Sequence, residues 1–182
     1  MEIKLNLGCG RDIRKGYINI DKIKICEGVD EVINFNEFPY PYKNNSIDEI
    51  LAFGLIEHLK DYEKSFKEFT RILKPSGFLH IKVPHFTCAG SNSEFHKTRF
   101  WFHSFNSYRI RKKCRTSGEA SDLYNPFIQI KKKINFVKGW LFWNYLIEPI
   151  INFHPFVSVL YEHTFLCYLF PASEVEVILK KK

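Results

Sequence analysis

A short apolar strand that runs into a two-glycine turn constrains this chain most. Lys4 to Leu7 leads into Gly8-Cys9-Gly10, and a second short strand ends on Asp21. A strand that stops on Gly-x-Gly brings bare backbone amides close to a ligand, and an acid at the tip of the next strand can accept hydrogen bonds from a ribose diol. The pattern predicts an α/β sheet with a nucleoside-binding edge. A tight turn without a ligand would use the same residues.

Four later segments follow this turn in a fixed order. They are Phe38-Pro39-Tyr40-Pro41-Tyr42, Ser46 to Phe53, Leu55-Ile56-Glu57-His58-Leu59 and Phe69 to Leu79. Together they resemble the class I S-adenosylmethionine-dependent methyltransferases, in particular the small single-domain, type 11-like branch. The resemblance covers residues 3–84 strongly and later residues less specifically. It implies an α/β, Rossmann-like mixed sheet of seven strands with helices on both faces and the last strand antiparallel.

The first helix of such a fold must be shortened here. Only the eight residues Cys9 to Gly16 separate the first two strands, fewer than the dozen or more that a parallel crossover with a helix needs. We therefore expect about one helical turn, with the aromatic second part of the chain covering that face.

Hydrophobic patterns place the other elements. Strands are predicted at residues 3–7, 17–20, 31–35, 47–53 and 78–83, and a helix at 61–73 that Pro75-Ser76-Gly77 stops. Alternating patterns predict two more strands at 128–136 and 175–179. Residues 140–170 are apolar but contain Pro149 and Pro155, which predicts short helices. The basic end, Lys180 to Lys182, is predicted to fray.

Length and charge indicate one domain with two unlike halves. The 182 residues are predicted to form a single methyltransferase domain, with a cofactor-binding half at 1–84 and an acceptor-side half at 85–182. The first half has 13 basic and 13 acidic residues, whereas the second has 14 and 7 and holds 20 of the 30 aromatic residues. An aromatic, basic surface suits an anionic amphiphile, a nucleotide-linked sugar, a membrane face or single-stranded nucleic acid. Ordinary core packing with solvated lysines is the alternative.

The cysteines and the apolar runs indicate the cellular compartment of the protein. Five cysteines without Cys-x-x-Cys predict reduced thiols and no metal site. The chain has no apolar run of membrane-spanning length and no signal-peptide core at its start. We expect a cytoplasmic protein.

The resemblance implies which residues bind the cofactor, S-adenosylmethionine. Gly8, Cys9 and Gly10 lie beside its amino-acid end, and Asp21 holds the ribose. Asn6 stands where the family more often has an acid, and an amide oxygen can still accept a hydrogen bond. The adenine side and the end of the fourth strand complete the set: Asn34, Phe35, Phe53, Gly54 and His58.

Two histidines are the candidate catalytic residues. His85 follows the fifth strand directly, and His96 lies in a His-Lys-x-x-Phe segment similar to one in small methyltransferases. Either can take a proton near neutral pH, although histidines in aromatic loops are often structural. The basic runs Arg109 to Arg115 and Lys131 to Lys133 are candidate sites for an acceptor phosphate or carboxylate, or else a solvated face.

The predicted function is methyl transfer to an unidentified acceptor. The favoured acceptor is anionic and carries a hydroxyl on a glycan, a lipid-linked sugar or a small metabolite. RNA or protein methylation is less favoured, because the chain has no Asn/Asp-Pro-Pro-Tyr/Phe signature. A non-catalytic S-adenosylmethionine-binding protein, peripheral membrane contact and any oligomeric state stay open. A nicotinamide-dependent oxidoreductase is disfavoured, since Ile13 stands where its third glycine belongs.

Overall fold

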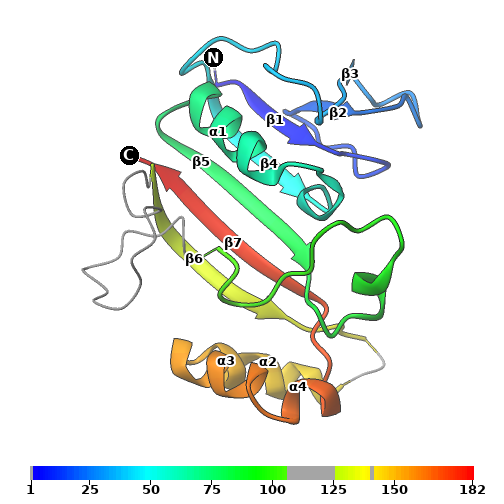
Figure 1. Cartoon of the computed structure of the whole chain (residues 1–182), viewed down its shortest axis with the longest axis vertical. Helices are drawn as coiled ribbons and strands as arrows, with labels where there is room; N and C mark the ends of the chain where they lie inside the picture. The colour runs from blue at the N-terminus through cyan, green and yellow to red at the C-terminus, as the bar shows by residue number, and fades with distance from the viewer. Residues whose placement is uncertain (1, 106–125, 140–141) are drawn as a thin grey trace.

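Seven strands form one mixed sheet in a computed structural model that describes residues 2–105, 126–139 and 142–182 (Figure 1). The strands are β1 (Lys4–Leu7), β2 (Ile18–Asp21), β3 (Glu31–Val32), β4 (Ile47–Phe53), β5 (Leu73–Pro84), β6 (Phe127–Asn135) and β7 (Glu174–Lys181). Their order is β3-β2-β1-β4-β5-β7-β6. β1 to β5 are parallel, and β7 lies antiparallel between β5 and β6. The predicted seven-stranded topology is confirmed.

Helix α1 (Tyr62–Ile72) covers one face of this sheet. Asp61 caps it, because the Asp61 carboxylate accepts a hydrogen bond from the Lys64 amide at 2.9 Å. The apolar side of the helix packs into a core that also contains the inward side chains of β4 and β5: Phe66, Phe69, Ile72, Ile50, Leu79 and Ile81. The helix ends one residue before β5, so the chain enters the next strand without a loop.

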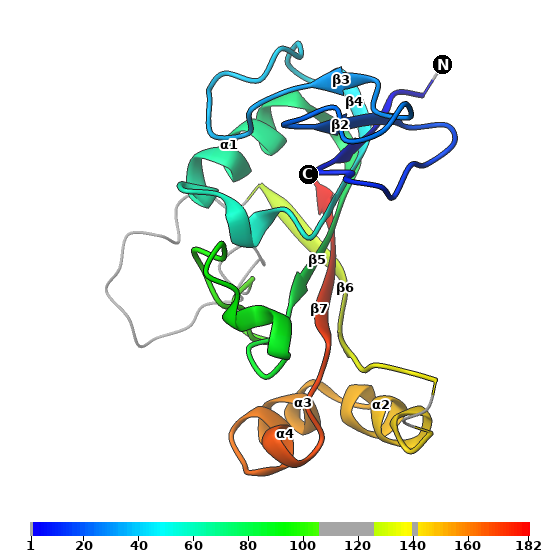
Figure 2. The same cartoon turned by 90° about the vertical axis from the view of Figure 1, so that its right-hand side faces the viewer.

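The opposite face of the sheet is solvated in the described residues. Along β5, buried Leu79, Ile81 and Val83 alternate with the more exposed Phe78, His80 and Lys82. Ion pairs lie on this face, with Glu49 near Lys4 at 3.4 Å and Glu176 near Lys133 at 3.4 Å. Figure 2 shows α1 on one side only. The structure thus departs from the expected helix cover on both faces, because β5 and β7 alternate as strands with one wet face do.

The connection from β1 to β2 contains turns and no helix. The Asp12 amide donates to the Cys9 carbonyl at 2.7 Å, and the Tyr17 amide donates to the Arg14 carbonyl at 3.3 Å. The connection is short, as the spacing predicts, but the expected single helical turn does not form, because the eight residues are used in two tight turns.

A long excursion separates β6 from β7, although antiparallel neighbours need only a two-residue turn. Residues 136–173 contain α2 (Asn144–Asn152), α3 (Pro155–Glu162) and α4 (Leu166–Leu169). Pro149 lies within α2 and Pro155 begins α3, which agrees with the predicted short helices. The three helices lie across one end of the sheet (Figures 1 and 2). They share a second apolar core with the ends of the sheet: Phe102, Ile134, Phe136, Ile151, Tyr161, Cys167 and Ala172.

The basic end of the chain is anchored, so the prediction of a frayed tail is wrong at Lys181. The Lys181 ammonium donates to the carbonyls of Thr70 and Leu73, both at 2.6 Å. Within the described ranges, every helix falls short of the length and apolar character that a membrane crossing requires.

Candidate functional site

The carboxyl ends of β1, β4 and β5 meet at one edge, because these strands are parallel neighbours. The turn after β1 needs glycine, since Gly8 has φ +65° and Gly10 has φ +51°. A Cβ at Gly8 would lie 3.1 Å from the Leu55 side chain, whereas a Cβ at Gly10 would meet no atom within 4 Å. Gly8 thus permits close packing, and Gly10 faces open space where a ligand can approach the backbone.

Asp21 is fixed beside this turn. One carboxylate oxygen accepts from the Gly10 amide at 2.8 Å, and the other accepts from the Lys22 amide at 2.7 Å. A carboxylate has about four lone-pair sites, so it keeps capacity for two hydroxyl donors. The open side of Gly10 and this oriented carboxylate fit the ribose and backbone contacts expected for an adenosine cofactor.

Replacing Asp21 with alanine is expected to weaken binding of S-adenosylhomocysteine by roughly 1.5–3 kcal/mol, as for hydrogen bonds to a charged group. Isothermal titration calorimetry measures this change. Glu63→Ala is the matched control, because Glu63 is an exposed acid on α1. Equal affinity in Asp21→Ala and wild type would exclude the ribose role.

Two other residues predicted to bind the cofactor are buried at the Gly8 to Gly10 turn. The buried Asn6 amide donates to the Asp12 carbonyl at 2.7 Å and to the Asn19 side chain at 2.9 Å. Only its oxygen remains to accept a hydrogen bond from a ligand. Cys9 is buried, and this burial raises the pKa of its thiol to about 11, so it stays protonated.

Asn34 and Phe35 lie in different environments although they are adjacent. Asn34 is exposed and donates to Glu37 at 2.7 Å. Phe35 is buried, with its ring edge-on to Tyr40 at 6.0 Å and its carbonyl accepting from the Tyr40 hydroxyl at 3.0 Å. Phe35 therefore contributes to the core, and Asn34 remains available at the surface.

Phe53 and Gly54 end β4 at the same edge. The Arg14 guanidinium lies 5.0 Å and the Lys82 ammonium 4.8 Å from the centre of the Phe53 ring. Cations over an aromatic face hold the ring in place. Gly54 has φ +65° and donates its amide to the Lys82 carbonyl at 2.9 Å, which turns the chain toward the next segment.

Glu57 is the group at this edge whose environment is most unusual. It lies in a short 3-10 helix, η1 (Ile56–His58), and is 2% exposed. Its Oε2 atom has no hydrogen-bond partner among the described residues. Burial, with a smaller contribution from Glu174, raises the pKa of Glu57 to about 7. Carboxyl groups tuned to this range serve as general bases at neutral pH.

Two histidines adjoin Glu57. The rings of His58 and His96 are 4.7 Å apart at 78°, and His58 Nδ1 lies 3.3 Å from the Phe95 carbonyl oxygen. Burial lowers the pKa of His58. Ligand-type atoms of the three residues lie within 4.8 Å of one another. One zinc ion joins atoms at most about 4.2 Å apart, so this spacing is loose for a metal but short enough for proton transfer through a water molecule.

The two predicted catalytic histidines differ in what they contact. His85 is fully buried, with Nδ1 2.7 Å from the Thr87 hydroxyl and Nε2 2.9 Å from the Glu162 carboxylate. Both ring nitrogens are therefore engaged, and the Nε2 contact joins the residue after β5 to α3. His96 instead lies beside Glu57. The sequence contained the signal for Glu57 in its Glu-His-Leu motif, but burial of the carboxyl group is visible only in the fold.

The predicted acceptor-binding lysines are engaged within the protein. Lys131 and Lys133 lie 3.7 and 3.4 Å from Glu176, and Lys132 donates to the Phe102 carbonyl at 2.7 Å. The run Arg109 to Arg115 lies outside the described residues.

Comparison with known proteins adds a family match over part of the chain and a shared fold. The family model described as Methyltransferase domain matches residues 8–81. The sequence matches none of the curated proteins. Among solved structures, a SAM-dependent methyltransferase from Archaeoglobus fulgidus is 17% identical, with a TM-score of 0.60 over 99% of this chain and 86% of its own.

Two further structures are similar at comparable levels. The YcgJ protein from Bacillus subtilis is 14% identical, with a TM-score of 0.59 over 100% of this chain and 92% of its own. The [4+2]-cyclase SpnF is 15% identical, with a TM-score of 0.59 over 99% and 74%. At such identities the structural likeness shows the fold, while the family match covers the glycine turn, Asp21 and the Glu57 motif. The family match over residues 8–81, together with the shared fold, supports a class I S-adenosylmethionine-dependent methyltransferase of the type 11 kind that uses S-adenosylmethionine as its cofactor.

Proposed function

We propose that the protein methylates a hydroxyl oxygen of a glycan, lipid-linked sugar or small metabolite, and that Glu57 accepts the hydroxyl proton. The observation that carries this proposal is the buried Glu57 carboxyl group, unpartnered at one oxygen among the described residues and adjacent to the histidine pair. When bound, S-adenosylmethionine supplies an activated methyl group. The protein's own residues must then orient an oxygen and remove its proton.

Each group at the edge has one task in this proposal. The Gly8 to Gly10 turn and Asp21 hold the cofactor, and Gly54 lets the chain turn so that Glu57 points to the acceptor side. Glu57 takes the proton, which leaves through His96 and the exposed His58 to solvent. The cytoplasmic location and the anionic acceptor remain parts of the proposal.

Two alternatives compete with this proposal. RNA or protein methylation would need a basic surface, yet Lys131 to Lys133 contact the protein itself. A non-catalytic cofactor-binding protein is motivated by Asn6, whose amide hydrogens are used inside the fold.

Transfer of a labelled methyl group separates these functions. The protein is incubated with methyl-labelled S-adenosylmethionine and, separately, with glycans, polyprenol-linked sugars, hydroxylated metabolites, transfer RNA and peptides. Label in an alkali-stable methyl ether is the expected result. Label in RNA or peptide, or label in none of the five, would contradict hydroxyl methylation.

The pH dependence of turnover tests the role of Glu57. A base must be deprotonated to accept a proton, so turnover should fall about tenfold per pH unit below the Glu57 pKa of about 7 and level off above it. Initial rates of S-adenosylhomocysteine release measure the profile. A rate that is flat from pH 5 to 8 would show that no such base acts.

A further inference from the structure

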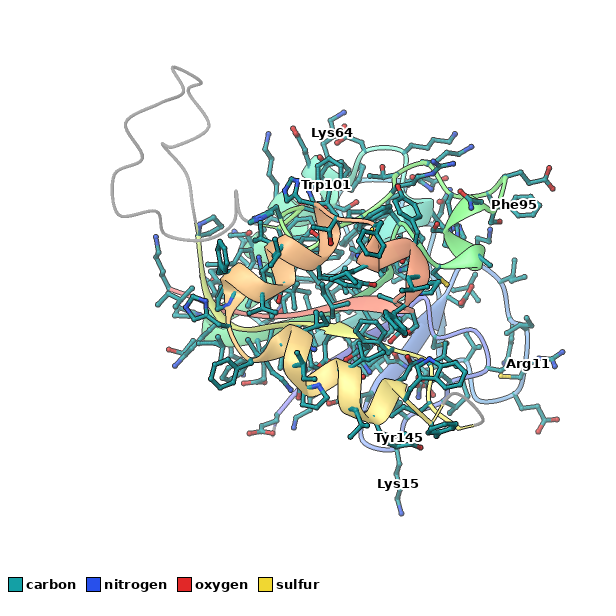
Figure 3. The ribbon with its side chains drawn as sticks, turned by 90° about the horizontal axis from the view of Figure 1, so that it is seen from below. Arg11, Lys15, Lys64, Phe95, Trp101 and Tyr145 are labelled. Atoms are coloured by element: carbon teal, nitrogen blue, oxygen red, sulfur yellow. The ribbon has the colours of Figure 1, made fainter. Side chains whose placement is uncertain are left out.

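The outer side of the helices between β6 and β7 is apolar to an unusual degree. Figure 3 shows α2, α3 and α4 across the underside of the molecule, with Tyr145 projecting outward from α2. Five aromatic side chains in this segment are 65–87% exposed: Phe142, Phe153, Phe156, Phe165 and Tyr168. At roughly 150–250 Å² per ring, they present on the order of 500 Å² of apolar surface. The largest apolar patch on a soluble monomer is typically about 300–600 Å² and is often functional, so this face is a candidate docking surface.

Charge is excluded from this outer side. Residues 142–171 contain two charged side chains, Glu148 and Glu162, and both are turned inward. Glu148 accepts from the Phe136 amide at 3.0 Å and pairs with Lys138, while Glu162 accepts from the Phe102 amide at 2.6 Å. The exposed residues are thus apolar or aromatic apart from His154 and His163. Such a surface can enter a headgroup region without dehydrating a charge.

The same face has a shallow apolar hollow. An open hollow of about 390 Å³ lies between α2 and α3 and is lined by apolar side chains alone: Pro149, Ile150, Phe153 and Val157. Trp143 directly precedes α2 and Tyr145 lies in its first turn, and aromatic residues of this kind are enriched where membrane and water meet.

Contacts connect this face to the candidate site. Glu162 at the end of α3 binds His85 and the Phe102 amide, which bracket the segment from 85 to 102. The same segment reaches Glu57, because the Lys97 amide donates to the Glu57 carbonyl at 2.7 Å. The helices therefore lie at the edge of the sheet where the acceptor would enter.

We propose that the outer face of α2–α4 docks on the headgroup region of an anionic lipid bilayer and presents the site to a lipid-linked acceptor. The half of the chain that contains this face, residues 85–182, carries the whole excess of seven positive charges, which favours an anionic membrane over a neutral one. A second copy of the chain is the competing occupant of this face, and the light-scattering outcome below distinguishes it from a membrane. The acceptor half of this proposal rests on the hydroxyl methylation proposed above, whereas the docking half does not.

Vesicle flotation of the full chain tests the docking. Wild type should float with vesicles of phosphatidylcholine mixed with phosphatidylglycerol, and less with phosphatidylcholine alone. Replacing Phe153 and Phe156 with serine should reduce the vesicle partition coefficient roughly tenfold per residue. Val32→Ser is the matched control, because Val32 is 57% exposed on β3 at the opposite edge of the sheet. It should float like wild type.

Three outcomes would overturn the proposal. Wild type could remain unbound with both vesicle types, the double variant could bind as wild type does, or light scattering could show a lipid-free dimer that the double variant abolishes. Calorimetry with S-adenosylhomocysteine separates this failure from failure of the cofactor site. If docking alone is wrong, all three proteins still bind the nucleoside with equal affinity.

Discussion

Replacing Glu57 with glutamine should lower turnover by about 10²–10⁴-fold and leave the affinity for S-adenosylhomocysteine unchanged. Glutamine keeps the size of the side chain but cannot accept the hydroxyl proton. Rates measured with an acceptor that wild type methylates, at pH above 7, give the change. Glu63→Gln, an exposed acid on α1, is the control and should turn over normally.

The same variant has a second readout that needs no acceptor. The folded-state pKa of Glu57 is raised from 4.5 to about 7, so its stabilising contribution is full below pH 4.5 and is lost as pH rises through 7. Over that window wild type should lose up to about 3 kcal/mol of unfolding free energy relative to Glu57→Gln. Urea denaturation at the two pH limits measures this difference. Parallel pH dependence, or normal turnover in Glu57→Gln, would rule out a tuned base at this position.

Replacing Gly8 with valine should abolish measurable binding of S-adenosylhomocysteine while the protein still melts cooperatively. A β-branched residue at φ +65° is strained by about 1–3 kcal/mol, and its Cβ would lie 3.1 Å from Leu55. The turn must then shift away from the ligand. Calorimetry measures binding, and a thermal melt verifies folding.

Gly16→Val separates strain from loss of the site. Gly16 has φ +83° and a Cβ there would meet no atom within 4 Å, so the variant carries comparable backbone strain away from the turn after β1. It should keep wild-type affinity. If Gly8→Val also keeps it, the ligand lies elsewhere.

Local patterns predicted much of the fold. The strand at residues 47–53 has the predicted bounds, and the predicted helix at 61–73 forms as Tyr62–Ile72 because its apolar residues recur at helical spacing. The alternation of His80 and Lys82 with apolar neighbours also indicates a sheet with one solvated face. The family resemblance implies helices on both faces, and at this strand the local pattern is the one that agrees with the structure.

Other features depend on tertiary contacts that no local pattern contains. His85 and His96 are equivalent in sequence reasoning, yet the fold engages both nitrogens of His85 and places His96 beside Glu57. The apolar sequence of residues 140–170 is compatible with either a core position or a surface position. Only the inward orientation of Glu148 and Glu162 distinguishes its two sides.

Hydrogen exchange of the wild-type protein with and without S-adenosylhomocysteine tests the location of the site most directly, because it requires no acceptor and no substitution. Ligand contact should slow exchange at the amides of Gly8 to Gly10 and of Gly54 to His58, and leave β6 and β7 unchanged. Unchanged exchange at both segments, together with protection elsewhere in the chain, would contradict a cofactor site at the carboxyl edge of β1 and β4.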